Sequence, residues 1–255
     1  MHDPVLPTGS DPVVGEVEHL GELAGEGILP RHVFVWLPPS YRAEPTRRYP
    51  VLYMHDGHNV IDPATSYAGV DWAVDEVAVQ MFDAGRIREF VLVGAHCTDD
   101  RFAEYGYTQE GRAYLRFLAD DLKPSIDDRF RTLPGREDTF VMGSSMGGLA
   151  SFLALWWHPG VFSAAACLSP FFPDELVADV EESAQWPPVR VYLDNGGDEL
   201  DATFQPNIDA LIGVLGSFDG LAPDDVRFFK DPVAPHDETA WSRRVWRPLE
   251  FLLGR

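Results

Sequence analysis

Ser145 is the residue of this sequence whose surroundings most clearly suggest covalent chemistry. It lies in Gly143-Ser-Ser-Met-Gly147, a G-x-S-x-G pattern that follows an apolar run at 139–142 and precedes an alanine-rich apolar run ending at Trp157. This pattern predicts a strand, a sharp turn and a helix, with the serine at the apex of the turn. To act as a nucleophile, a serine must be exposed and must lie near a base and near groups that bind the oxyanion. A helix that starts directly after the serine supplies free N–H groups and the positive end of its dipole for the oxyanion. The alternative is an ordinary strand–helix turn.

The general base is sought among eight histidines. Only His236 follows Ser145, comes after the last predicted strand and precedes the final helix, which agrees with the order serine, acid, histidine of open α/β hydrolase sheets. The acid is expected between these two residues, on the loop 194–201. Four carboxylates of that loop could orient the imidazole, and the residues alone leave the choice open: Asp194, Asp198, Glu199 and Asp201.

An oxyanion hole needs two backbone donors. One is the N–H of Met146, directly after the serine. The second is expected from the loop after the strand at 49–54, where Gly57 allows a close backbone approach and the N–H of His58 is the donor. A competing interpretation gathers a metal ion from His55, His58, His96, Asp99 and Asp100. His-x-x-His in a loop is a weak zinc signature, so no metal or other cofactor is predicted.

Strands alternate with helices through most of the chain. Apolar runs predict buried parallel strands at 49–54, 90–95, 139–142, 162–168, 189–193 and 226–229, while helical spacing predicts helices at about 72–84, 111–129, 148–157, 204–215 and 238–253. Segments 13–23 and 31–37 predict an antiparallel N-terminal strand pair. The expected fold is one α/β domain over residues 1–255, with a mainly parallel sheet, helices on both faces, no large cap and a flexible tail at 1–12.

The charge balance excludes several classes of partner. With 41 acidic and 20 basic residues the net charge is −21 at pH 7, which repels phosphate backbones and anionic lipids. No apolar run is long enough to span a membrane, the N-terminus lacks a secretory pattern, and Cys97 and Cys167 end apolar runs as buried thiols do. We therefore expect a cytoplasmic protein without nucleic-acid or membrane partners, either monomeric or homodimeric.

Six segments carry a resemblance to a known family. They are 50–59, 117–132, 143–149, 159–170, 194–199 and His236 with Trp241. Together they resemble the putative esterase family of α/β hydrolases, which includes enterochelin (trilactone) esterases, feruloyl and acetyl-xylan esterases, S-formylglutathione hydrolase and mycolyltransferases. In that family the acid often lies three residues after the glycine of an Asp-x-Gly loop. Counted from Gly196, this position is Glu199, with Asp198 as the second choice, although Gly197 departs from the family pattern.

The resemblance implies a serine esterase that acts on a small-molecule ester through an acyl-enzyme, without a cofactor. Aromatic side chains expected at the active edge could form an aromatic or sugar-binding wall: Trp72, Tyr105, Tyr107, Phe171 and Phe172. They favour an acyl or aryl ester of a sugar, phenolic or siderophore type, the last only if arginines such as Arg101 or Arg112 line the pocket. The alternatives are an acyltransferase that uses the same acyl-serine and, less favoured because serine and histidine are both present, a non-catalytic binding protein.

Overall fold

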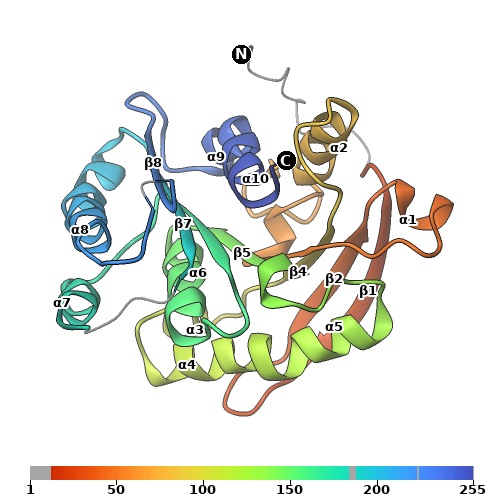
Figure 1. The fold of residues 1–255 in the computed structure, drawn as a ribbon, viewed down its shortest axis with the longest axis horizontal. Coiled ribbons are helices and arrows are strands. Elements are labelled where there is room, and N and C mark those ends of the chain that lie inside the picture. Colours follow the sequence, from red (N-terminus) through yellow and green to blue (C-terminus); the bar gives the residue numbers. More distant parts are fainter. Residues whose placement is uncertain (1–12, 184–187, 223, 255) are drawn as a thin grey trace.

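The computed structural model describes residues 13–183, 188–222 and 224–254, which form an eight-stranded sheet with helices on both faces (Figure 1). The strands are β1 (Glu16–Leu23), β2 (Arg31–Leu37), β3 (Val51–Met54), β4 (Val91–Ala95), β5 (Thr139–Ser144), β6 (Ala164–Leu168), β7 (Arg190–Asn195) and β8 (Val226–Lys230). Their order is β1-β2-β4-β3-β5-β6-β7-β8. β2 pairs antiparallel with β1 and β4, and all other neighbours are parallel. The predicted mainly parallel sheet with an antiparallel N-terminal pair is confirmed.

The helices form two layers. They are α1 (Ser40–Ala43), α2 (Val74–Asp83), α3 (Arg101–Glu104), α4 (Gln109–Arg116), α5 (Lys123–Arg129), α6 (Met146–Trp157), α7 (Asp174–Glu182), α8 (Glu199–Leu215), α9 (Glu238–Arg244) and α10 (Trp246–Leu253). Figure 1 shows α2, α9 and α10 on one side of the sheet and α4 to α8 on the other. A π-helical segment, Phe117–Leu122, joins α4 to α5.

The central strands are apolar throughout because both of their faces are covered. In β3, Val51 and Tyr53 belong to the core under α4 to α8, whereas Leu52 and Met54 belong to the core under α2, α9 and α10. A strand covered on both faces shows a continuous apolar run and no alternation. This rigid sheet places the ends of β3, β5, β7 and β8 along one edge, where functional groups of such folds lie.

Some elements differ from the sequence-based expectation. The helix predicted at 204–215 begins at Glu199, because the Asp198 side chain accepts a hydrogen bond from the Asp201 amide at 2.8 Å and caps it. The single helix expected at 238–253 is two helices that meet at Val245, and α7 was not predicted. The tail expected at 1–12 lies outside the described residues. Every helix within the described ranges is too short or too polar to cross a lipid bilayer.

Asp75, in the first turn of α2, links stability to pH. One of its oxygens accepts a hydrogen bond from the Val14 amide at 2.7 Å, and the other is buried without a partner among the described residues. Burial raises the pKa of Asp75 from 3.8 to about 6. Because the pKa is higher in the folded than in the unfolded state, this group reduces stability increasingly as the pH rises from about 4 to about 6.

Asp75→Asn is therefore expected to raise the free energy of unfolding at pH 7.5 by about 1–2 kcal/mol. The gain should disappear near pH 4, where the wild-type carboxyl is also neutral. Urea denaturation at the two pH values measures it. Asp83→Asn, which changes an exposed carboxyl of the same helix, is the matched control, and an equal gain at both pH values for Asp75→Asn would contradict the argument.

Candidate active site

Ser145 lies on a strained turn between β5 and α6. Its φ and ψ are 54° and −120°, a conformation that non-glycine residues rarely adopt and that is typical of functional turns. A Cβ atom on Gly143 would lie 2.6 Å from the carbonyl oxygen of Gly147, and one on Gly147 would lie 3.3 Å from both Asp56 Oδ2 and His55 Cβ. The two glycines of the pattern therefore permit the close packing that places Ser145 at the N-terminus of α6.

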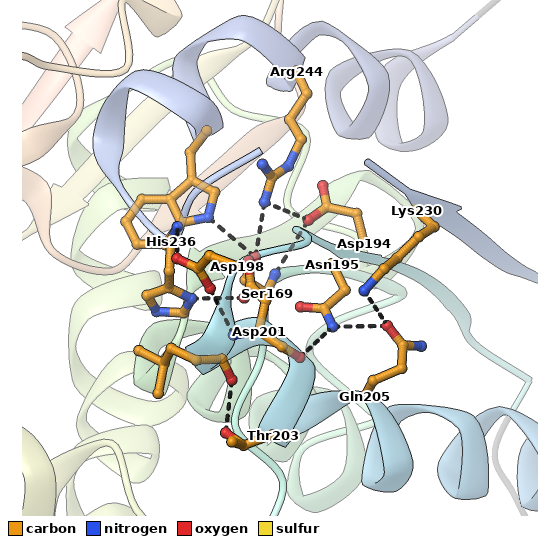
Figure 2. Close-up of polar contacts among 12 residues, drawn as sticks. Ser169, Asp194, Asn195, Asp198, Asp201, Thr203, Gln205, Lys230, His236 and Arg244 are labelled. Carbon is orange, nitrogen blue, oxygen red and sulfur yellow. Dashed lines mark hydrogen bonds and ion pairs between the residues drawn. The ribbon is translucent and has the colours of Figure 1, made fainter. Parts of the chain in front are cut away.

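His236 is paired with Asp201, which is in the first turn of α8 (Figure 2). The imidazole Nδ1 lies 2.8 Å from Asp201 Oδ1, and the carboxylate is fully buried. The rings of Phe204 and Trp241 meet the imidazole edge to face, with ring centres 5.5 Å and 5.0 Å away. The aromatic contacts and the carboxylate together fix the orientation of the imidazole.

The carboxylate that contacts the imidazole is neither of the two predicted from the family pattern. Glu199 is the exposed first residue of α8 and forms no hydrogen bond with His236. Asp198, the second choice, caps the helix and accepts a hydrogen bond from the His236 backbone amide at 2.7 Å, so it holds the main chain and not the ring. The capping makes residues 199–201 a helical turn where the sequence indicated a loop, and this turn brings Asp201 inward.

Two glycines after β7 make room for this pairing. A Cβ atom on Gly196 would lie 1.9 Å from Asp201 Oδ2, and one on Gly197 would lie 2.0 Å from the carbonyl oxygen of Pro232. Gly197 also donates a backbone hydrogen bond to Ala234 at 2.9 Å. Gly197, a departure from the family pattern, thus lets the two loops that carry the acid and the histidine pack directly together.

A buried ion pair lies behind the histidine (Figure 2). Arg244 contacts Asp194 Oδ1 at 3.1 Å and donates to Ser169 Oγ at 2.8 Å, and Trp241 Nε1 lies 3.4 Å from the same hydroxyl. Burial raises the pKa of Asp194, although the charge of Arg244 opposes this effect. Asp194 therefore ties β6, β7 and α9 together and supports Trp241 against His236, and it does not contact the imidazole.

The loop after β3 approaches the serine from the other side. Asp56 has a left-handed backbone (φ 53°), its amide donates to the Tyr105 hydroxyl at 3.0 Å, and a single 3₁₀ turn follows at Gly57–Asn59. A Cβ atom on Gly57 would lie 2.7 Å from the carbonyl carbon of Gly94, so only glycine fits against β4. His58 lines one cavity with Ser145, and Met146, the first residue of α6, lines another.

Arg101 neutralises the carboxylate of this loop. Its Nε and a terminal nitrogen donate to the two oxygens of Asp56 at 2.8 Å and 2.7 Å. Burial alone would raise the pKa of Asp56, but the hydrogen bonds and charge of Arg101 outweigh burial and lower it. The region next to Ser145 consequently carries no uncompensated negative charge from Asp56 that would oppose an oxyanion.

The possible metal ligands that lie together in the structure are not the set suggested by the sequence. His55 is buried and pairs with the Tyr114 hydroxyl at 2.7 Å, away from His96. Asp56, His58 and Cys97 have potential ligand atoms within 4.8 Å of one another. However, both oxygens of Asp56 are bound by Arg101, and burial raises the pKa of the Cys97 thiol to about 12. These donors are arranged for the ion pair and not for a cation.

Tyr105 holds the Asp56 amide, which yields a test of the loop. Tyr105→Phe is expected to lower kcat about tenfold or more with KM little changed, because the loop that carries Gly57 and His58 loses its buried hydroxyl partner. Steady-state kinetics on a p-nitrophenyl ester measure this. Tyr53→Phe is the matched control, since the Tyr53 hydroxyl is buried without a partner among the described residues. Equal losses in the two variants would rule out a specific role of Tyr105.

Two cavities meet at Ser145 and His236, and these two residues line both cavities. The first, of about 450 Å³, has the polar side chains of Asp56, His58, Asn59 and Glu238 in its wall beside the rings of Tyr67 and Trp241, and we call it the polar cavity for the former. The second, of about 530 Å³, is apolar and lined by Met146, Phe171, Leu200 and Phe204. Arg101 and Phe102 belong to both walls. The site can thus accommodate two chemically different groups on either side of the serine.

Most of the aromatic residues expected at the site do not reach these cavities. Phe171 lines the apolar cavity, whereas Trp72, Tyr105 and Phe172 are buried in the core. Tyr107 stacks on Trp157 in a separate cavity that also includes Arg112. Phe102, Leu200 and Phe204 line the apolar cavity and were not predicted from the sequence. The i, i+4 spacing of Leu200 and Phe204 after the capping Asp198 was the available signal.

Comparison with known proteins identifies the family of this chain. Residues 29–242 match the family described as Putative esterase. The chain belongs to this esterase family. As a member, the esterase is a carboxylic ester hydrolase.

Three similar proteins place the esterase among its relatives. An endo-1,4-beta-xylanase/feruloyl esterase of Xylanibacter ruminicola is 31% identical over 138 residues, which cover 51% of this chain and 18% of that protein. The structure of a ferulic acid esterase has a TM-score of 0.74 at 20% identity and covers 93% of this chain and 98% of that one. A ferric enterobactin esterase of Salmonella typhimurium has a TM-score of 0.77 at 15% identity, with 98% and 61% covered. The two structures share the α/β-hydrolase fold with this esterase.

Proposed function

We propose that the esterase hydrolyses its substrate through an acyl-enzyme formed on Ser145, with His236 as the base and Asp201 as the acid. The observation that carries the proposal is the buried Asp201 carboxylate, 2.8 Å from His236 Nδ1, beside a histidine that shares both cavity walls with Ser145. A carboxylate at Nδ1 selects the tautomer whose Nε2 is free to accept a proton, and it stabilises the imidazolium.

The proposed reaction has two halves. In the first, Ser145 Oγ attacks the ester carbonyl while His236 Nε2 accepts its proton, and the alcohol leaves with that proton. In the second, His236 takes a proton from water as the water attacks the acyl carbonyl, and it then gives that proton to Ser145 Oγ as the acid is released. The N–H groups of Met146 and of the Gly57–His58 loop are the proposed donors to the oxyanion, supported by their places in the first turn of α6 and on the loop held by Tyr105.

Stopped-flow kinetics test the two-step mechanism. With a p-nitrophenyl ester whose deacylation is slow, one equivalent of p-nitrophenolate per enzyme should appear before the steady state. The test uses a panel of esters that differ in steady-state rate. If none of them gives a burst and product release is linear from the first turnover, no acyl-enzyme accumulates.

The two cavities suggest the substrate class. We propose an ester with an apolar or aromatic group on one side of the carbonyl and a polar, hydrogen-bonding group on the other, such as a sugar or phenolic ester. The apolar wall of Phe171, Leu200 and Phe204 and the polar wall of Asp56, Asn59 and Glu238 support this pairing. Arg101 lies in both walls but is paired with Asp56, so it offers less to the anionic groups of a siderophore-type ester than an unpaired arginine would. Arg112 lines a different cavity.

Phe171 tests the apolar half of this proposal. Two ester series are compared, one that varies the acyl group from acetyl to benzoyl and one that varies the alcohol. In one of the two series, Phe171→Ala should reduce the preference in kcat/KM for the larger apolar group about tenfold, because a partly buried ring is lost from the wall. Tyr67→Ala, an exposed ring of the polar cavity, is the control and should leave that preference unchanged. An unchanged preference in both series for Phe171→Ala would refute the assignment.

A further inference from the structure

A groove outside the catalytic cavities is lined by residues of β7, β8 and α10. Figure 1 shows where these elements lie. β8 is the last strand and pairs only with β7, so α10 leaves this corner partly uncovered. The cavity has a volume of about 400 Å³. We call it the β8–α10 groove. Its walls are formed by Tyr192, three aromatic residues (Phe228, Phe229 and Trp246), two arginines (Arg227 and Arg247) and Glu250.

Both arginines of the β8–α10 groove lie over aromatic rings. The guanidinium carbon of Arg247 lies 3.9 Å from the ring centre of Phe229 and 4.3 Å from that of Trp246. The guanidinium carbon of Arg227 lies 5.4 Å from the ring centre of Phe251. A guanidinium group over a ring restricts the side chain by a cation–π contact, and its N–H groups can still donate to an acceptor.

These two charges are uncompensated within the part of the chain that the structure describes. Neither arginine forms an ion pair or donates a hydrogen bond to a described residue, although the sequence has 41 acidic and only 20 basic residues. The carboxylate of the groove, Glu250, is already paired with Arg86 at 2.9 Å. The net charge of the protein repels anions, but two unpaired guanidinium groups in one aromatic groove create a local positive charge that can attract one.

We infer that the β8–α10 groove binds a small aromatic carboxylate. The edge of a guanidinium group matches the two oxygens of a carboxylate, and ring contacts with Phe228 and Phe229 suit a planar aromatic body. Phe228 is an exposed large apolar side chain, and the volume lies in the range of small-molecule sites. The groove shares no lining residue with either catalytic cavity, so the inference does not depend on the proposed catalytic mechanism.

Indole resonances can distinguish this groove from the catalytic site. Trp246 lines the groove and Trp241 lines the polar catalytic cavity. In protein with ¹⁵N-labelled tryptophan, their side-chain N–H signals are assigned with Trp246→Phe and Trp241→Phe. Titration with benzoate should shift the Trp246 signal to saturation. Benzamide, which has the same shape without the charge, should bind at least about tenfold more weakly at this signal.

Matched variants test the two arginines. Arg227→Gln and Arg247→Gln should each weaken benzoate binding at the Trp246 signal about tenfold. Arg243→Gln, which changes an exposed arginine of α9 outside the groove, should leave it unchanged. The inference is overturned if benzoate moves only the Trp241 signal, if benzamide binds as well as benzoate, or if Arg243→Gln weakens binding as much as the groove variants. Ester hydrolysis should be unaffected by the groove variants, so failure here leaves the catalytic proposal standing.

Discussion

Asp201→Asn is expected to lower kcat by about 10³–10⁴ with a much smaller effect on KM. The Asp201 carboxylate is fully buried and contacts Nδ1 of His236, so an amide in its place stabilises the imidazolium poorly and favours the wrong tautomer. Steady-state kinetics on an activated ester, with circular dichroism as the check of folding, measure the loss.

Its neighbours in the first turn of α8 provide the controls. Glu199→Gln changes an exposed carboxylate and should keep kcat within about twofold of wild type, since surface substitutions perturb little. Asp198→Asn retains a capping side chain and should lower kcat far less than Asp201→Asn. A large loss for Glu199→Gln together with a small one for Asp201→Asn would return the acid to the position implied by the family pattern.

Ser145→Ala is expected to reduce kcat by about 10⁵–10⁶, the scale on which removal of a serine nucleophile acts. The backbone strain at this position is the same for alanine and serine, so the variant should fold and retain both cavities. Ser144→Ala is the matched control, because Ser144 ends β5 and lines the polar cavity without occupying the apex of the turn. Only a modest change in kcat is expected for it.

Traces of wild-type or host esterase in the Ser145→Ala preparation could account for a small residual activity, so the source of that activity must be checked. Residual activity of Ser145→Ala should not respond to a fluorophosphonate and should follow protein concentration in independent preparations. A variant that retained more than about one-hundredth of the wild-type kcat would exclude Ser145 as the nucleophile.

The nucleophile turn and the histidine loop were predictable because their positions depend on topology. A G-x-S-x-G pattern between a buried strand and an apolar helix has few alternative structures, and Ser145 is found at that turn. The order of elements likewise left His236 as the histidine after the last strand. Both residues line the same cavities in the structure, which agrees with their predicted proximity.

The residue that contacts the imidazole was not predictable by counting from Gly196. Four acids lie within eight residues, and the choice depends on where α8 begins. A side-chain cap from Asp198 and close packing of Gly196 against Asp201 Oδ2 determine that start. The segment is held in turn by contacts with the loop at 231–236, where the His236 amide donates to Asp198 and the Gly197 amide donates to Ala234, and no periodicity in the sequence reports them.

The aromatic wall was predicted from loop position, which does not reveal where a ring points. Tyr105 follows β4 as expected, but its hydroxyl is needed under the Asp56 amide and the ring is fully buried. Phe102, on the short helix α3, is 74% exposed and lines both cavities. A four-residue helix has too few positions to show a hydrophobic period, so its outward face could not be recognised from the sequence.

Labelling with a fluorophosphonate, followed by peptide mass mapping, tests the central claim most directly. Wild-type protein should lose activity in proportion to the incorporation of one phosphonyl group, and that group should lie on Ser145. Asp201→Asn should be labelled much more slowly and Glu199→Gln at the wild-type rate, because Asp201 contacts the His236 imidazole and Glu199 does not. Full inactivation with the label on another residue, or full labelling without loss of activity, would contradict the assignment of Ser145, His236 and Asp201.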